Sequence, residues 1–297
     1  MSRTFADLGL TSKLLDSLTQ SGFVNPFPIQ EAVIPLALTG ADIIGQAKTG
    51  TGKTLGFGLP ILNNVKRGSG KAVALVVVPT RELGIQVAEE LNKLSSGPDL
   101  RVTAIYGGRP MEPQIAELKK GVDIVVGTPG RLLDLHRQKA LDLSEVKHLV
   151  LDEADEMLSS GFKEQVYNIF QFLPRDVQVG LFSATLQHDL MTLTEKFMRD
   201  PVKILVKSEM LTLEGISQYY IALEDDGQKY SCLKDLFNSL TVSQCIIYCN
   251  SVRRVSDLYE AMKEDKFPVC CIHSGMEKEE RNESYNQFKT GKFRVLI

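Results

Sequence analysis

The chain has 297 residues, 43% of them hydrophobic, which excludes a disordered chain and predicts one full globular domain with a smaller second one. Its formal net charge of −3 excludes a strongly basic surface, so any contact with nucleic acid must be local. No run approaches the roughly 18 apolar residues of a membrane span, and the first residues lack an apolar signal segment, so we expect an intracellular protein, cytoplasmic rather than nuclear, without a membrane partner.

A glycine-rich loop follows the apolar pair at residues 43–44. Gly50 and Gly52 let the backbone turn so that successive N–H groups face inward, as a bound phosphate requires. Lys53 can then reach the outer phosphates of a nucleotide, and the Thr54 hydroxyl can ligate Mg²⁺. The sequence therefore predicts a nucleotide site.

The helix expected at residues 55–62 places this loop at a helix N-terminus, whose dipole favours anions. Ala47 stands where the general phosphate-loop pattern has glycine. A glycine-rich turn between a strand and a helix is the alternative, but the ordered Gly-x-Gly-Lys-Thr core favours the nucleotide. The loop residues expected to bind it are Ala47, Lys48, Thr49, Gly50, Thr51, Gly52, Lys53 and Thr54.

Short apolar segments alternate with helical patterns along the first two thirds of the chain. This alternation is typical of an α/β fold with a parallel sheet covered by helices on both faces. Strands are expected at residues 73–78, 102–106, 124–126, 148–151 and 179–182, and helices at 28–38, 81–94, 111–120, 130–135 and 162–172.

Carboxylates follow the expected strand at 148–151, where Asp152, Glu153 and Asp155 occur together. We expect Asp152 to hold Mg²⁺, partly through water, because this ion keeps much of its hydration shell. We expect Glu153 to orient and deprotonate the attacking water. The alternative is an acidic first turn of a helix, which explains one carboxylate better than three combined with the upstream loop.

A segment without clear periodicity, 208–215, separates an expected first domain, 1–207, from a second one, 216–297. All five cysteines fall between Cys232 and Cys271, and reduced core thiols are expected there, neither a disulfide nor a zinc site. Expected strands are 217–223, 245–248, 269–272 and 293–297, and expected helices are 229–239, 252–263 and 278–289.

The Asp-Glu-Ala-Asp run, together with the phosphate loop, resembles the DEAD-box ATP-dependent RNA helicases. The resemblance implies a RecA-like first domain and a second, incomplete RecA-like domain. Residues 3–31 resemble the Q motif of this family. There Gln30 is implied to read the adenine edge, and an upstream aromatic residue is implied to stack on the base, so Phe5 and Phe23 are included in the nucleotide site.

Further segments resemble the RNA-facing motifs of the family, and their chemistry suits recognition of the RNA backbone. Arginines can pair with phosphates, hydroxyls can donate hydrogen bonds, and glycines permit close approach. Taken singly, these segments are ordinary turns, helix starts and solvated charges. The residues implied to contact RNA are Pro79, Thr80, Arg81, Gly107, Gly108, Thr128, Pro129, Gly130, Arg131 and, in the second domain, Asn250.

Ser183 and Thr185 resemble the family motif that couples the nucleotide state to RNA. The resemblance implies that their hydroxyls hydrogen-bond the Asp155 carboxylate. A helix N-cap is the competing role, and the two roles are compatible.

The later part of the chain most resembles translation initiation factor 4A and its near relatives. In the family, the strand at 294–297 is followed by two more motifs that supply an arginine to the γ-phosphate, a contribution of about 10³ to 10⁵ in rate. Because neither motif occurs here, we expect a C-terminally truncated chain that binds adenosine nucleotides with little RNA-stimulated turnover.

The expected function is ATP-dependent RNA unwinding or remodelling, with ATP and Mg²⁺ as cofactors and RNA as partner. One alternative is a non-catalytic, ATP-dependent RNA-binding module or truncated regulator. Another is a DNA helicase or other phosphate-loop ATPase, which would not need the Gln30 region. The sequence does not identify protein partners.

Overall fold

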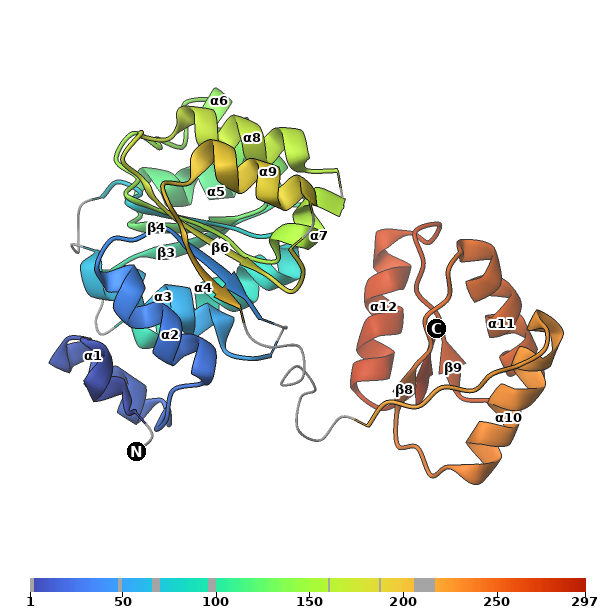
Figure 1. Ribbon diagram of the computed structural model, residues 1–297. Coiled ribbons are helices and arrows are strands. Elements are labelled where there is room, and N and C mark those ends of the chain that lie inside the picture. The colour runs from blue at the N-terminus through green and yellow to red at the C-terminus, as the bar shows by residue number, and fades with distance from the viewer. Residues whose placement is uncertain are drawn as a thin grey trace. The chain divides into compact units, whose positions relative to one another are not determined.

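The computed structural model describes residues 3–47, 50–65, 70–95, 100–159, 161–186, 188–205 and 217–297. The chain divides into two compact units, Met1–Ile216 and Ser217–Ile297, which we describe separately (Figure 1). The predicted linker at 208–215 lies outside the described residues, so the domain limits given above stay predictions.

The first unit is built on one sheet of parallel strands in the order β3-β4-β2-β5-β6-β1-β7. Strands β2 and β4 are buried along their whole length, as expected for parallel strands covered on both faces. This confirms the predicted α/β fold. The strands are β1 (Ile43–Gln46), β2 (Ala74–Val77), β3 (Val102–Ile105), β4 (Ile124–Gly127), β5 (His148–Leu151), β6 (Gln178–Ser183) and β7 (Val202–Leu205).

Helices cover both faces of this sheet (Figure 1). Helices α2, α3 and α4 contribute to one apolar cluster and α6, α8 and α9 to another. Alternate residues of β2 serve the two clusters: Ala74 and Val76 join the first, and Leu75 and Val77 the second. The helices are a 3₁₀ turn η1 (Phe5–Leu8), α1 (Ser12–Gln20), α2 (Pro28–Leu38), α3 (Lys53–Asn64), α4 (Arg81–Leu94), α5 (Met111–Lys119), α6 (Pro129–Arg137), α7 (Ala154–Ser159), α8 (Lys163–Phe172) and α9 (His188–Phe197).

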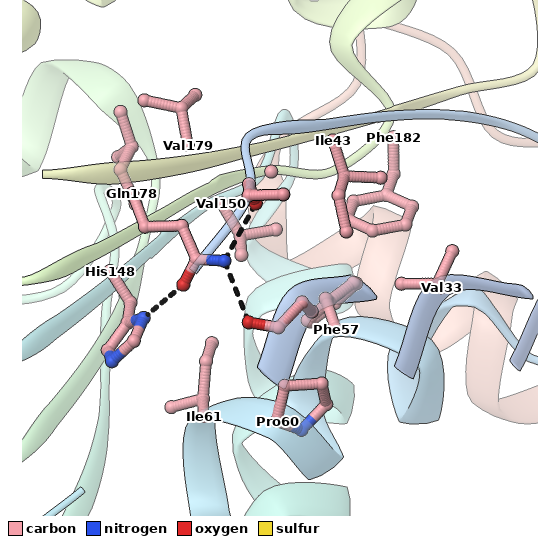
Figure 2. Close-up of a pocket in the computed structure, with 14 residues that line it drawn as sticks. Val33, Ile43, Phe57, Pro60, Ile61, His148, Val150, Gln178, Val179 and Phe182 are labelled. Carbon is pink, nitrogen blue, oxygen red and sulfur yellow. Dashed lines mark hydrogen bonds between the residues drawn. The ribbon is translucent and has the colours of Figure 1, made fainter. Parts of the chain in front are cut away.

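A small cavity of about 30 Å³ lies between this sheet and helices α2 and α3 (Figure 2). At its edge, His148 Nδ1 lies 2.9 Å from Gln178 Oε1, and Gln178 Nε2 donates to the carbonyls of Ala37 and Ala41 at 2.9 and 2.8 Å. Gln178 therefore ties the amino ends of β5, β6 and β1 together. Burial lowers the pKa of His148, and the hydrogen bond with Gln178 only partly opposes this effect.

We expect acid to weaken the fold through His148. As the pH falls below the ordinary imidazole pKa of 6.5, His148 takes up a proton in the unfolded chain but not yet in the folded chain. The free energy of unfolding therefore decreases as the pH falls, until the pH is below the folded pKa. The variant His148→Asn lacks this titration and should lose less unfolding free energy between about pH 7.5 and pH 5.5. Urea unfolding of both proteins at the two pH values measures the free energy of unfolding. If both proteins lose the same amount between the two pH values, the assignment to His148 is wrong.

The second unit has a small parallel sheet in the order β8-β10-β9. Its core contains Val255, Met262, Val269 and Val295. Cys270 and Cys271 are buried, and burial raises the pKa of both thiols. The elements are η3 (Asp226–Gln228), α10 (Lys229–Ser239), β8 (Cys245–Ile246), α11 (Val252–Glu264), β9 (Val269–Cys270), α12 (Lys278–Lys289) and β10 (Val295–Leu296).

The strand predicted at 217–223 is wrong, because this segment has no strand assignment in the structure. Tyr219 and Tyr220 are 89% and 92% exposed. Aromatic and β-branched residues favour a strand only where a neighbouring strand supplies hydrogen bonds and a packing surface, and within the described residues this segment has neither. Among the helices of the described residues, none combines the length and the apolar character that a membrane span requires.

Candidate nucleotide and RNA site

The loops after β1, β5 and β6 meet at one edge of the sheet, because these three strands are neighbours and parallel. The loop after β1 leads into α3, which begins at Lys53. Gly50 and Gly52 both have left-handed backbones, with φ of 85° and 84°, which glycine adopts without strain. Lys48 and Thr49 lie outside the described residues.

A buried ion pair joins this loop to the carboxylates after β5. Lys53 Nζ lies 2.9 Å from Glu153 Oε1, and the two side chains are only 5% and 12% exposed. Two sequence motifs one hundred positions apart therefore form one site. Thr54 is half-buried in the first turn of α3.

Asp152 lies in the same site and is 2% exposed. Burial raises its pKa to about 7, an effect that the nearby Lys53 charge opposes and the Glu153 charge reinforces. Its Oδ1 accepts a hydrogen bond from the Glu153 N–H at 3.0 Å. A buried carboxylate that is costly to ionise suits a divalent cation, whose charge would stabilise the ionised form.

Gln30 ties the amino-terminal segment to the phosphate loop. Its side chain is 1% exposed; Nε2 donates to the Gly52 carbonyl at 3.0 Å, and Oε1 accepts from the Phe27 N–H at 2.9 Å. A Cβ on Gly52 would lie 2.4 Å from Gln30 Nε2 and 2.8 Å from Phe27 Cδ2. Glycine is thus required at this position both by its φ and by its neighbours.

The two aromatic residues assigned to base stacking are packed in the protein. Phe5 is 4% exposed and belongs to an apolar cluster with Leu14 and Ile34, and Phe23 packs partly buried against the same cluster. This burial leaves Phe5 no free ring face for a base in this structure. The aromatic side chain that is exposed beside Gln30 is Phe27, at 54%.

The coupling residues form a compact network between β6 and α7. The Thr185 hydroxyl and N–H donate to Asp155 Oδ2 at 2.7 and 3.0 Å, which is the hydrogen bond expected for Thr185. Ser183 differs from the expectation: its hydroxyl accepts from the Asp155 N–H at 3.2 Å and donates to the Thr185 carbonyl at 2.7 Å. Burial raises the pKa of Asp155, but the hydrogen bonds outweigh it and leave the pKa lowered.

The segments predicted to contact RNA follow β2, β3 and β4, which are also neighbours in the sheet. Thr80 caps α4, since its Oγ1 accepts from the Leu83 N–H at 3.3 Å. Arg81 is exposed, and its guanidinium lies 5.1 Å from the centre of the Tyr106 ring. Gly107 and Gly108 are also exposed.

Arg131 reaches from the first turn of α6 to the loop after β3. Its Nη2 donates to the Arg109 carbonyl at 3.0 Å, and its Nη1 is buried without a partner within the described residues. Arg109 Nη1 in turn donates to the Tyr106 hydroxyl at 2.8 Å. Thr128 and Gly130 are half-buried and Pro129 is buried. The guanidinium groups of Arg81 and Arg109 lie 5.1 and 5.6 Å from the centre of the Tyr106 ring, and Arg131 joins this basic group through the Arg109 backbone.

Gln114 is a supporting residue that sequence reasoning missed. Its buried amide accepts from the Tyr106 N–H at 3.0 Å and donates to the carbonyls of Tyr106 and Pro110, both at 3.2 Å. These bonds fix the loop that carries Gly107 and Gly108. A single polar residue on an amphipathic helix gives no sequence signal for such a role. Asn250 is exposed after β8 in the second unit.

Family models agree with this geometry. The DEAD/DEAH box helicase model matches residues 27–193, and the helicase conserved C-terminal domain model matches residues 228–297. The chain belongs to the DEAD-box helicases.

Relatives and solved structures show the same membership. The ATP-dependent RNA helicase eIF4A of Kluyveromyces lactis is 42% identical over 99% of this chain and 74% of its own length, and eukaryotic initiation factor 4A of Caenorhabditis elegans is 43% identical over 99% and 73%. A DEAD box protein from Methanococcus jannaschii matches with a TM-score of 0.67 and 34% identity, covering 100% of this chain and 80% of that one. Dbp5 of S. cerevisiae bound to RNA and ADP BeF3 matches with a TM-score of 0.85 and 29% identity, covering 100% and 75%.

In this helicase, the buried Asp152 should weaken the fold as its proton is lost. The folded carboxyl keeps its proton up to about pH 7, whereas the unfolded one releases it near pH 3.9. The contribution of this group to stability is therefore fully present below about pH 3.9 and is lost above about pH 7. We expect the melting temperature of Asp152→Asn, relative to the unaltered protein, to rise between about pH 5 and pH 8.

Thermal unfolding of the nucleotide-free proteins at the two pH values measures this difference. Asp134→Asn, which changes an exposed carboxylate on α6, is the matched control and should show no such rise. A difference for Asp152→Asn that stays constant with pH would contradict the raised pKa.

Proposed function

We propose that this helicase binds ATP with Mg²⁺ at the edge formed by β1, β5 and β6, binds RNA at the adjoining loops after β2, β3 and β4, and couples ATP hydrolysis to RNA unwinding or remodelling. The observation that carries the proposal is the 2.9 Å contact between Lys53 and Glu153, which brings a phosphate-binding lysine and a candidate base into one buried site.

The nucleotide roles follow from the donors at this edge. Lys53 binds the outer phosphates, and the Thr54 hydroxyl and Asp152 hold Mg²⁺, Asp152 partly through water. When bound, Mg²⁺ neutralises charge on the phosphate oxygens. Glu153 orients and deprotonates the attacking water. Since Lys53 pairs with Glu153 in this structure, arrival of the phosphates must redirect Lys53 and release the carboxylate for that task.

The RNA role follows from the side chains on the loops after β2, β3 and β4 and on the first turns of the helices that follow them. Arg81, Arg109 and Arg131 supply positive charge, and Thr80 and Thr128 supply hydroxyls, beside the exposed Gly107 and Gly108. Such groups read phosphates and sugars and carry little sequence information. Dbp5 in its RNA-bound structure supports the same role here. The eIF4A relatives support an intracellular, cytoplasmic place of action.

Titration calorimetry with MgATP on residues 1–297 tests the site. Lys53→Met should weaken binding at least about tenfold, because the phosphates lose a charged donor worth roughly 1.5–3 kcal/mol. Glu153→Gln should keep binding, because it removes the base and not the phosphate contacts. If the unaltered chain shows no saturable MgATP binding, the proposal is wrong.

Hydrolysis separates the helicase from a non-catalytic RNA-binding module. We expect RNA to stimulate turnover once the second helicase domain of a full-length relative is supplied in trans, and Glu153→Gln to reduce it by about 10² to 10⁴. RNA that binds only with ATP, while turnover stays absent, would favour the non-catalytic module. Stimulation by DNA equal to that by RNA would favour a general phosphate-loop ATPase.

Gln30 is proposed to select adenine, because each of its amide atoms has capacity for one more hydrogen bond beyond those to Gly52 and Phe27. Gln30→Ala should weaken ATP binding about tenfold more than GTP binding, since a bidentate amide contact contributes about 1–3 kcal/mol of discrimination. Competition binding with both nucleotides measures the ratio. Equal weakening of ATP and GTP would mean that Gln30 acts only by holding the phosphate loop.

A further inference from the structure

The second unit has a pocket between α10 and α11, next to the segment that follows β8 (Figure 1). We call it the α10–α11 pocket. Its volume is about 620 Å³, within the range of roughly 300–1,000 Å³ that is typical of small-molecule sites. Cys249 and Ala261 place small side chains on its wall, where larger ones would fill the space.

The inner wall of this pocket is apolar and held in place. Leu233, Ile247 and Leu258 line it and also pack, half-buried, against the core of the second unit. A ligand that covers these side chains removes apolar surface from water, and little ordering of the protein is needed because the core already fixes them. The pocket therefore favours a ligand with an apolar body.

The mouth of the pocket carries an excess of positive charge. Asp226 pairs with Lys229 Nζ and with Arg254 Nη2, both at 2.7 Å, so two cations share one carboxylate. The other carboxylate of the lining, Asp257, lies 3.8 Å from Arg253 on the same helix. These pairs together contain three positive and two negative groups. Because lysine has three N–H donors and arginine has five, both cations at the mouth can bind a ligand oxygen and keep Asp226.

We propose that the α10–α11 pocket binds a small amphipathic molecule that carries one carboxylate. The apolar body of the ligand lies against Leu233 and Leu258, and its carboxylate lies between Lys229 and Arg254 at the mouth. This site is separate from the proposed nucleotide site, whose residues all belong to the first unit.

Phenylbutyrate and phenylbutyramide test the pocket, because they share a shape and differ in charge. Titration of each compound into the whole chain, followed by NMR of labelled leucine methyl groups, should shift the signals of Leu233 and Leu258 saturably. The carboxylate should bind about 2- to 30-fold more tightly than the amide, the range for two exposed ion pairs. Equal affinities, or no saturable shift with either compound at millimolar concentration, would overturn the proposal.

Three variants separate the two parts of the site. Arg254→Gln should remove most of the preference for the carboxylate and leave binding of the amide unchanged. Lys263→Gln is the matched control, because it removes one charge from an exposed position of α11 outside the lining, and it should keep the preference. Ala261→Phe fills the pocket and should abolish binding of both compounds. If Ala261→Phe binds phenylbutyrate as the unaltered protein does, the compound binds elsewhere and the proposal is wrong.

RNA is the competing occupant, because its phosphates are anionic and Asn250, which the family resemblance assigns to RNA, lines the same pocket. Phenylbutyrate affinity that stays unchanged when single-stranded oligoadenylate RNA is added supports a separate small-molecule site. Displacement of phenylbutyrate by this RNA would make the pocket part of the RNA surface and overturn the proposal.

Discussion

The buried pair of Lys53 and Glu153 is the interaction on which the site depends. Each charge is costly to bury alone, and each is made tolerable by the other at 2.9 Å. Removing one partner from such a pair leaves an uncompensated charge, so any ligand that draws Lys53 away must itself be anionic, and Glu153 then needs a new partner. Under the proposed function both groups gain a new partner at once, because the triphosphate pairs with Lys53 while the attacking water hydrogen-bonds to the Glu153 carboxylate. Binding of the substrate and exposure of the base are thus one event.

Under the proposed function, strand order explains how one sheet edge can serve two ligands. The nucleotide loops follow β5, β6 and β1, and the RNA loops follow β3, β4 and β2, so the two groups meet where β2 pairs with β5. Residues Val77 and Leu151, side by side in that pairing, precede Pro79-Thr80-Arg81 on one strand and Asp152 on the other. A movement of either loop can therefore be transmitted to the other loop through the β2–β5 strand pair. The Asp155–Thr185 hydrogen bond adds a second link, between α7 and the end of β6.

The sequence could predict the elements whose signals are local. Helices at 28–38 and 81–94 have the predicted bounds, because Pro28 starts one and the Thr80 cap starts the other. Contacts made across the fold could not be predicted. Phe5 and Phe27 are both phenylalanines that precede Gln30, and only packing tells which ring is buried. Likewise, the strand predicted at 217–223 has no partner strand among the described residues, and no local pattern can reveal that. The Ser183 hydroxyl bonds the Asp155 N–H across the β5–β6 pair, and Gln114 bonds the loop that folds back on its own helix; neither contact has a local sequence signal.

The backbone at Glu153 shows how tightly the site is specified. Its φ of +49° is a left-handed conformation that costs a residue with a Cβ roughly 1–2 kcal/mol, and asparagine, aspartate or glycine would adopt it more readily. Glutamate persists there because three features depend on the turn: the Glu153 N–H bonds to Asp152 Oδ1, its carboxylate reaches Lys53, and α7 begins at the next residue. The turn thus directs Glu153 to the phosphate loop and Asp155 to Thr185 within four positions of chain. A glycine would relieve the strain and remove the only carboxylate that contacts Lys53 among the described ion pairs, so under the proposed function the strain is the cost of holding the base beside the phosphates.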